Sequence, residues 1–187
     1  MDNDGRINIA RFIERLDGCF NRNDMKAARE CIEYWEAEGL RLYDQAAHCY
    51  IGSDLTESYE YAALLNNKAA ALNALKRYDE AEENWKAAIG ILKKVGFHND
   101  EIAISLVLLA HLTFDRDNTA YEKVEALLDE AWEYLYSDDQ AKDGNNAYVL
   151  RECAPSFEYF QRSMEAQALR DVAREINEGY RWDSKFI

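Results

Sequence analysis

Histidine and cysteine are the residues that most often carry acid–base, nucleophilic or metal chemistry, and this chain has three histidines and four cysteines. His48 and Cys49 are adjacent, and such a pair could supply a base and a thiol nucleophile. Neighbouring side chains on a helix, however, point about 100° apart and do not easily share one site. His98 and His111 belong to no known catalytic motif. These residues therefore give little support for catalysis.

The cysteines also lack the spacing of a metal site, since Cys19, Cys31, Cys49 and Cys153 form no CxxC pair. The sequence contains no glycine-rich phosphate loop, no HExxH and no GxSxG. No secretory segment follows Met1, so the cysteines are expected to be reduced thiols of a cytoplasmic protein. We therefore predict that the protein is not an enzyme and has no catalytic residues, metal or cofactor.

The elements that would position any site are helices, and the clearest of them lie in Tyr61–Gly96. Two helical patterns there are joined by a tight turn at Leu75–Arg77. The apolar positions that recur at helical spacing are Leu65, Ala69 and Leu72 in the first pattern and Ala81, Trp85, Ala88 and Leu92 in the second. Small alanines allow the two backbones to approach closely, and Trp85 fills the space that they leave.

Similar patterns cover the rest of the chain. Helices are predicted over the following ranges: 7–20, 25–38 with an extension or a short extra helix over 39–50, 59–75, 101–114, 121–136, 147–162 and 163–177. Capping residues are expected at Asn23 or Asp24, at Ser53 or Asp54, and at Asn99 or Asp100. Pro155 should kink or restart its helix, and Gly179 should end the last one. The sequence therefore predicts an all-α protein.

The helix pairs repeat along the chain. Ala28, Ala81, Val124 and Ala166 occupy corresponding positions, and the last three are 43 and 42 residues apart. The central pair resembles a tetratricopeptide repeat (TPR), a unit of about 34 residues. The residues that match the family pattern are Leu65, Asn67, Ala69, Leu72, Tyr78, Ala81, Trp85 and Ala88. The longer spacing is similar to the long-helix variety found in kinesin light chains.

The resemblance implies a right-handed superhelix of about four TPR-like helix pairs in one domain. The repeats would span residues 6–50, 59–96, 100–137 and 146–178, followed by a C-terminal tail at 180–187. In the family, the first helix of each repeat lines a groove that binds peptides. Carried over by position, the groove residues would be Asn66, Asn67, Ala70, Asn73, Ile104, Val107, His111, Tyr148 and Arg151. Asn66 and Asn73 could instead belong to an ordinary hydrated face, and Ile104 and Val107 to the core.

Charge limits the class of partner. The formal net charge is −14, and Asp115–Asp143 alone holds ten acidic and three basic residues. Such a surface repels nucleic-acid backbones and anionic membranes. The charge either only keeps the protein soluble or attracts a basic partner.

Function is therefore predicted as that of a cytoplasmic adaptor that binds a protein or peptide in the groove. Two other functions stay open. The chain could be a structural protein that self-associates as a homo-oligomer, or a sensor of a small ligand or accessory subunit of an enzyme. The sequence allows either a monomer or a homodimer.

Overall fold

The computed structural model describes residues 9–22, 24–137 and 142–183, with all side chains in these ranges except those of 9–13, 20, 28 and 180–183. Within these residues the protein is helical and contains no strand, as predicted. Its α-helices are α1 (Ile9–Asn21), α2 (Met25–Tyr50), α3 (Tyr59–Ala74), α4 (Tyr78–Val95), α5 (Asn99–Arg116), α6 (Tyr121–Leu135), α7 (Gly144–Tyr159) and α8 (Ser163–Asp183). A short 3₁₀ helix, η1 (Asp54–Glu57), precedes α3.

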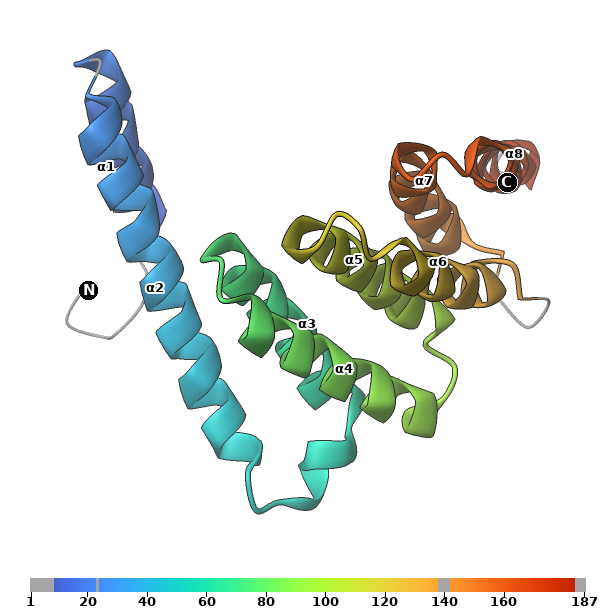
Figure 1. Cartoon of the computed structure of the whole chain (residues 1–187), viewed down its shortest axis with the longest axis horizontal. Helices are drawn as coiled ribbons and strands as arrows, with labels where there is room; N and C mark the ends of the chain where they lie inside the picture. Colours follow the sequence, from blue (N-terminus) through green and yellow to red (C-terminus); the bar gives the residue numbers. More distant parts are fainter. Residues whose placement is uncertain (1–8, 23, 138–141, 184–187) are drawn as a thin grey trace.

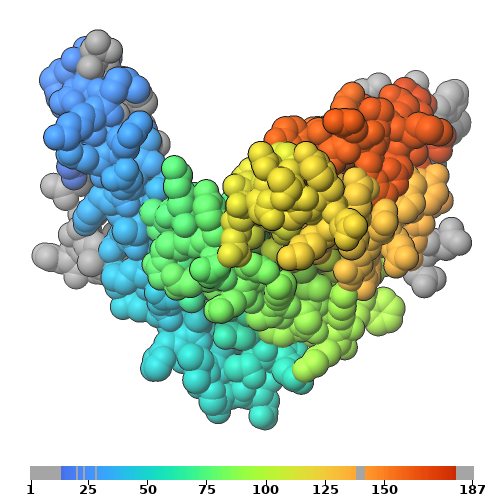
Figure 2. Space-filling model, in the orientation of Figure 1, coloured from blue at the N-terminus to red at the C-terminus, as the bar shows by residue number. Residues whose placement is uncertain are grey.

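The helices pack as adjacent pairs: α1 with α2, α3 with α4, α5 with α6, and α7 with α8. Figure 1 shows these pairs following one another across the molecule, with α1 and α8 at opposite ends. The second half of α2 lies along α3, where Lys68 Nζ is 2.8 Å from Asp44 Oδ1. On the side drawn in Figure 2, the surface is hollowed between the first half of α2 and the pair α3/α4.

The core of the central pair is the one that the sequence predicts. Ala69, Leu72, Ala81, Ala88 and Leu92 have no exposed surface, and Trp85 is 1% exposed. One continuous cluster of buried apolar side chains extends from α2 through α8. From α3 to α8, the apolar stripe of each helix is therefore covered by its neighbours, as amphipathic helices require.

The turn between α3 and α4 has a close copy between α7 and α8. Lys76 has φ 59° and Gln161 has φ 64°, so both residues adopt the left-handed conformation. One residue later, Arg77 N donates to the carbonyl of Leu72 at 2.9 Å, and Arg162 N donates to that of Phe157 at 2.8 Å. These bonds satisfy carbonyls that the end of a helix leaves unpaired.

α2 is one continuous helix through Gly39 to Tyr50, so the predicted extension is confirmed and the alternative of a short extra helix is not. Several predicted caps, however, are wrong. Ser58 rather than Ser53 caps α3, with its hydroxyl accepting from Tyr61 N at 3.2 Å, because η1 occupies the residues in between. α5 begins at Asn99 without any side-chain cap. Only the cap at Asp24, which accepts from Ala27 N, agrees with its prediction.

The helix-breaking residues also behave differently from the prediction. α7 runs through Pro155 as one helix. Pro155 lies on an exposed side of α7 and has no N–H to donate to the carbonyl of Arg151. Gly179 does not end α8, whose backbone continues to Asp183. The side chains of the tail 180–187 lie outside the described residues, as does that of the repeat position Ala28.

Among the residues that the structure describes, no helix combines the length and the apolar character needed for a membrane span.

Candidate functional site

The first helices of the last three pairs, α3, α5 and α7, lie side by side. Ser105 Oγ of α5 donates to Asn66 Oδ1 of α3 at 2.9 Å. On the other flank of α5, Asp100 accepts from Asn146 Nδ2 at 3.0 Å, and His111 Nε2 lies 2.9 Å from Ser156 Oγ, both on α7. Hydrogen bonds therefore join the three helices into one layer.

An exposed or half-buried stripe runs along each of these helices on the side away from its partner helix. We call this surface the α3–α5–α7 face. Its members are Asn67, Ala70 and Ala74 on α3, Ile104, Leu108 and His111 on α5, and Tyr148, Arg151 and Tyr159 on α7. The face changes along its width from small and polar, through apolar, to aromatic and charged. It could hold an extended chain by hydrogen bonds to the side-chain amide of Asn67 on one side and by apolar contacts on the other.

Three of the predicted groove residues lie in the seams between helices instead. Asn66 is half-buried and bonded to Ser105. Asn73 is half-buried, and its Oδ1 is buried with no hydrogen-bond partner among the described residues. Val107 is 4% exposed and belongs to the core. A guest chain on the surface therefore cannot reach it.

His111 lies in an aromatic cluster and is only partly accessible from the surface. Its ring centroid is 4.8 Å from that of Phe160 and 5.4 Å from that of Tyr159, and Phe114 adjoins both of these rings. Burial lowers the pKa of His111, and the negative charge of Asp115 opposes this change only partly. The folded protein therefore favours the neutral imidazole.

The lowered pKa of His111 predicts a loss of stability on acidification. The unfolded chain takes up a proton near the ordinary histidine pKa of about 6.5, whereas the folded chain resists it until a lower pH. The stabilising effect is thus complete above about pH 6.5 and is lost as the pH falls through the folded pKa. Urea unfolding at pH 7.5 and pH 5.5 should show a smaller loss for His111→Gln than for wild type. His48→Gln, at an exposed histidine, should match wild type; equal losses in all three proteins would contradict this assignment.

A large cavity opens at one end of the α3–α5–α7 face, where α5 and α7 begin. Its volume is about 1020 Å³. The lining residues are Tyr59, Gly96, Phe97, His98, Asn99, Asp100, Glu101, Ile104, Asp143, Asn145, Tyr148 and Val149. Only Ile104 and Tyr148 were among the predicted groove residues. The sequence pattern assigned the segment 97–100 to a turn, and nothing local in it indicates a cavity.

The carboxylates of this cavity are held by neutral donors. Glu101 Oε1 accepts from the hydroxyl of Tyr59 at 3.2 Å, and Asp143 caps α7 by accepting from Asn146 N at 2.9 Å. Among the described residues, neither Glu101 nor Asp143 forms an ion pair, and no lysine or arginine lines the cavity. The negative charge of Glu101 raises the pKa of Tyr59, and burial adds to the effect. The cavity therefore carries a negative potential.

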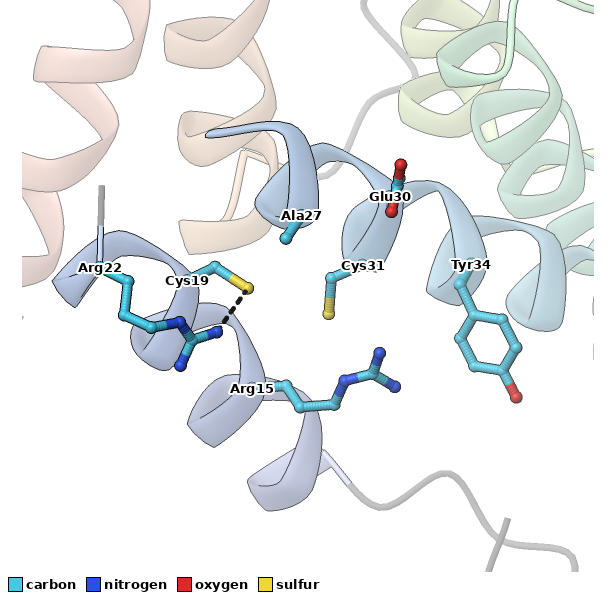
Figure 3. A pocket seen from close by; sticks show the side chains of 7 residues that line it. All are labelled: Arg15, Cys19, Arg22, Ala27, Glu30, Cys31 and Tyr34. Carbon is cyan, nitrogen blue, oxygen red and sulfur yellow. Dashed lines mark hydrogen bonds between the residues drawn. The ribbon is translucent and has the colours of Figure 1, made fainter. Parts of the chain in front are cut away.

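A second cavity, of about 600 Å³, lies between α1 and α2. Figure 3 shows the side chains of Cys19 and Cys31 directed into it, with Arg15 and Arg22 beside them. Arg22 Nη2 is 3.9 Å from Cys19 Sγ. Both thiols are buried, at 6% and 2% exposure, and mixed charges line the opening. This cavity has neither the size nor the uniform charge of the first.

Part of the acidic segment Asp115–Asp143 serves to join helices. The guanidinium of Arg162, at the start of α8, lies 2.8 Å from Asp129 Oδ1 and 3.5 Å from Glu125 Oε2 on α6. Lys93 of α4 pairs with Glu130 of α6. These carboxylates are already matched within the protein, so the charge available to a partner on α6 is smaller than the sequence suggests.

A scan of the chain against models of known protein families finds no match, and a search of the curated proteins finds none either.

Proposed function

We propose that this chain is a TPR-like helical repeat protein of the long-helix variety, with four helix pairs in a right-handed superhelix. The support is the regular sequence separation of its contacts. Hydrogen bonds between neighbouring first helices join residues 39 to 46 positions apart. Ion pairs between neighbouring second helices, Lys93–Glu130 and Glu125–Arg162, both span 37 positions. Stacked copies of one structural unit produce such a pattern.

The copied turn supports the same proposal. Arg77 follows the left-handed residue of the α3/α4 turn and bonds Glu80 with two nitrogens. Arg162 follows the left-handed residue of the α7/α8 turn and bonds Glu165 in the same way. Corresponding positions in the second and fourth helix pairs thus carry the same two residue types, which make the same contacts.

We further propose that the protein is a cytoplasmic adaptor that binds an extended peptide on the α3–α5–α7 face. The observation that carries this proposal is the alignment of three exposed stripes on adjacent helices. Ala70 and Ala74 leave room for a guest backbone beside Asn67, whose amide can both donate and accept. Leu108 and Tyr148 offer exposed apolar surface to its side chains. Free rather than paired cysteines agree with a reducing compartment.

Replacement of Asn67 tests the peptide site. Peptides selected on wild-type protein from a phage-displayed random library should bind Asn67→Ala about 1–3 kcal/mol more weakly in calorimetry, because one donor and one acceptor are lost. Asn67 is exposed, so the melting temperature should not change.

Asn118→Ala provides the matched control. Asn118 is equally exposed but lies in the turn between α5 and α6, away from the face. Equal binding by wild type, Asn67→Ala and Asn118→Ala would contradict the proposed site. Sedimentation equilibrium addresses the rival function: a stable homo-oligomer that covers the face would favour self-association over peptide binding.

A further inference from the structure

The cavity where α5 and α7 begin adjoins the α3–α5–α7 face, and they share Ile104 and Tyr148. A peptide lying across the face can therefore place one side chain in the cavity. The chemistry of the cavity wall indicates which side chain that would be. This inference rests on the proposed peptide-binding function.

Aromatic rings form part of the wall. The rings of Tyr59 and His98 are stacked, with centroids 4.3 Å apart and planes inclined by 21°. Phe97 also lines the cavity and is fully exposed, so its ring contributes nothing to the core. It has φ 63°, a conformation in which a glycine would be less strained. Neither packing nor backbone geometry explains a phenylalanine at this position.

The cavity wall also carries negative charge. Asp100, Glu101 and Asp143 all line the cavity. Asp100 and Glu101 lie in the first turn of α5, and Asp143 is the N-cap of α7. Each helix N-terminus acts as roughly half a positive charge. The helix dipoles therefore offset only a minor part of the negative charge of the three carboxylates. An anionic guest would be repelled, whereas a cationic guest would be attracted.

We propose that this cavity binds the side chain of an arginine in a peptide that lies across the α3–α5–α7 face. A guanidinium is planar, stacks on aromatic rings and offers five donors to carboxylates. An ammonium is a compact and strongly hydrated charge that uses aromatic walls less well. Tyr148 already has a guanidinium above its ring: Arg151 Cζ lies 5.4 Å from the centroid. Arg151 belongs to the face and does not line the cavity, so the cavity itself is open to a second guanidinium.

The test uses small probes on the whole chain. ¹⁵N-labelled protein is titrated with N-acetyl-arginine-N-methylamide and, separately, with the citrulline analogue, which has the same shape but no charge. The arginine probe should produce saturable shifts of the backbone amides of residues 97–101 and 145–149. The citrulline probe should produce none at the same concentration. Equal binding of the two probes would overturn the proposal, as would arginine shifts that lie elsewhere.

Two variants locate the binding without disturbing the fold. Glu101→Gln keeps an acceptor for the hydroxyl of Tyr59 but removes the charge, and it should weaken the arginine probe about fivefold, the upper end for a partly exposed ion pair. Phe97→Gly removes the exposed ring and relieves the backbone, so it should also weaken binding while the protein stays folded. The control Glu133→Gln removes an equally negative, exposed group on α6 that does not line the cavity, and it should bind as wild type does. If all three variants bind alike, the assignment is wrong.

The failure of this inference and that of the proposed function are distinguishable. If the binding of library peptides depends on Asn67, but these peptides are not enriched in arginine and the probe does not bind, the peptide site is supported and the arginine pocket is contradicted. If the probe binds as described but the binding of no peptide depends on Asn67, the cavity is a site for free arginine and the adaptor function is contradicted. Binding of arginine-rich peptides that Glu101→Gln and Asn67→Ala both weaken supports the two together.

Discussion

We expect Trp85→Ala to lower the free energy of unfolding by about 3–5 kcal/mol, the usual range for truncating a fully buried aromatic side chain. Trp85 of α4 is 1% exposed and lies in the continuous core cluster. Alanine would lose the apolar contacts of the indole and leave a void that the surrounding helices fill only partly. Since small domains are stable by about 5–15 kcal/mol, this single change should remove much of the total. Urea unfolding followed by circular dichroism measures it.

Two further variants separate volume from hydrogen bonding at this position. The indole Nε1 of Trp85 is buried without a partner among the described residues. Trp85→Phe removes that unsatisfied donor and keeps most of the ring, so it should cost much less than Trp85→Ala. Met164→Ala, at a side chain that is 89% exposed, should change the free energy of unfolding by less than about 0.5 kcal/mol. A loss below about 1 kcal/mol for Trp85→Ala would contradict the packing of the central pair.

The second large effect is expected when volume is added instead of removed. Ala88 has no exposed surface, and the close packing of α4 leaves no space for a longer side chain. Ala88→Leu should force neighbouring helices apart or its own side chain into a strained rotamer, at a cost of about 1–3 kcal/mol or more. Thermal and urea unfolding should both report the loss.

The neighbouring residue provides a matched control. Ala87 precedes Ala88 on the same helix but is exposed. Alanine and leucine have similar helix propensities, so Ala87→Leu should leave the melting temperature nearly unchanged. The two variants thus add the same atoms to the same helix and differ only in the side of the helix on which these atoms lie. Equal effects would mean that α4 does not present its Ala88 side to the core.

Apolar periodicity was sufficient to predict the elements of this fold. Every helix begins within a few residues of its predicted start, and the predicted core positions Leu65, Ala69, Leu72, Trp85 and Leu92 are all buried. The reason is that a helix is amphipathic at a local spacing of three and four residues, which can be read without knowledge of its neighbours. The tight turn at Leu75–Arg77 could be predicted for the same reason.

The ends of helices depended more on context. Pro155 and Gly179 are local breakers, but tertiary packing on one side and solvent on the other allow α7 and α8 to continue through them. Ser58 caps α3, in place of the predicted Ser53 or Asp54, because η1 occupies the residues in front of it. Local propensity is worth about 1 kcal/mol for a glycine or a cap and about 3 kcal/mol for a proline, and packing over a whole helix outweighs it.

The position of Asn67 on an exposed helix side could be inferred from the sequence, because the same periodicity that buries Leu65 and Ala69 turns Asn67 outward. The burial of Val107 could not, since α5 is apolar almost all the way round and its sequence does not say which side α7 covers. The cavity likewise required the tertiary structure. Its wall combines Tyr59, Phe97 and Glu101 with Tyr148, which come from three helices and one turn. The stacking of successive helix pairs alone brings these distant parts of the chain together.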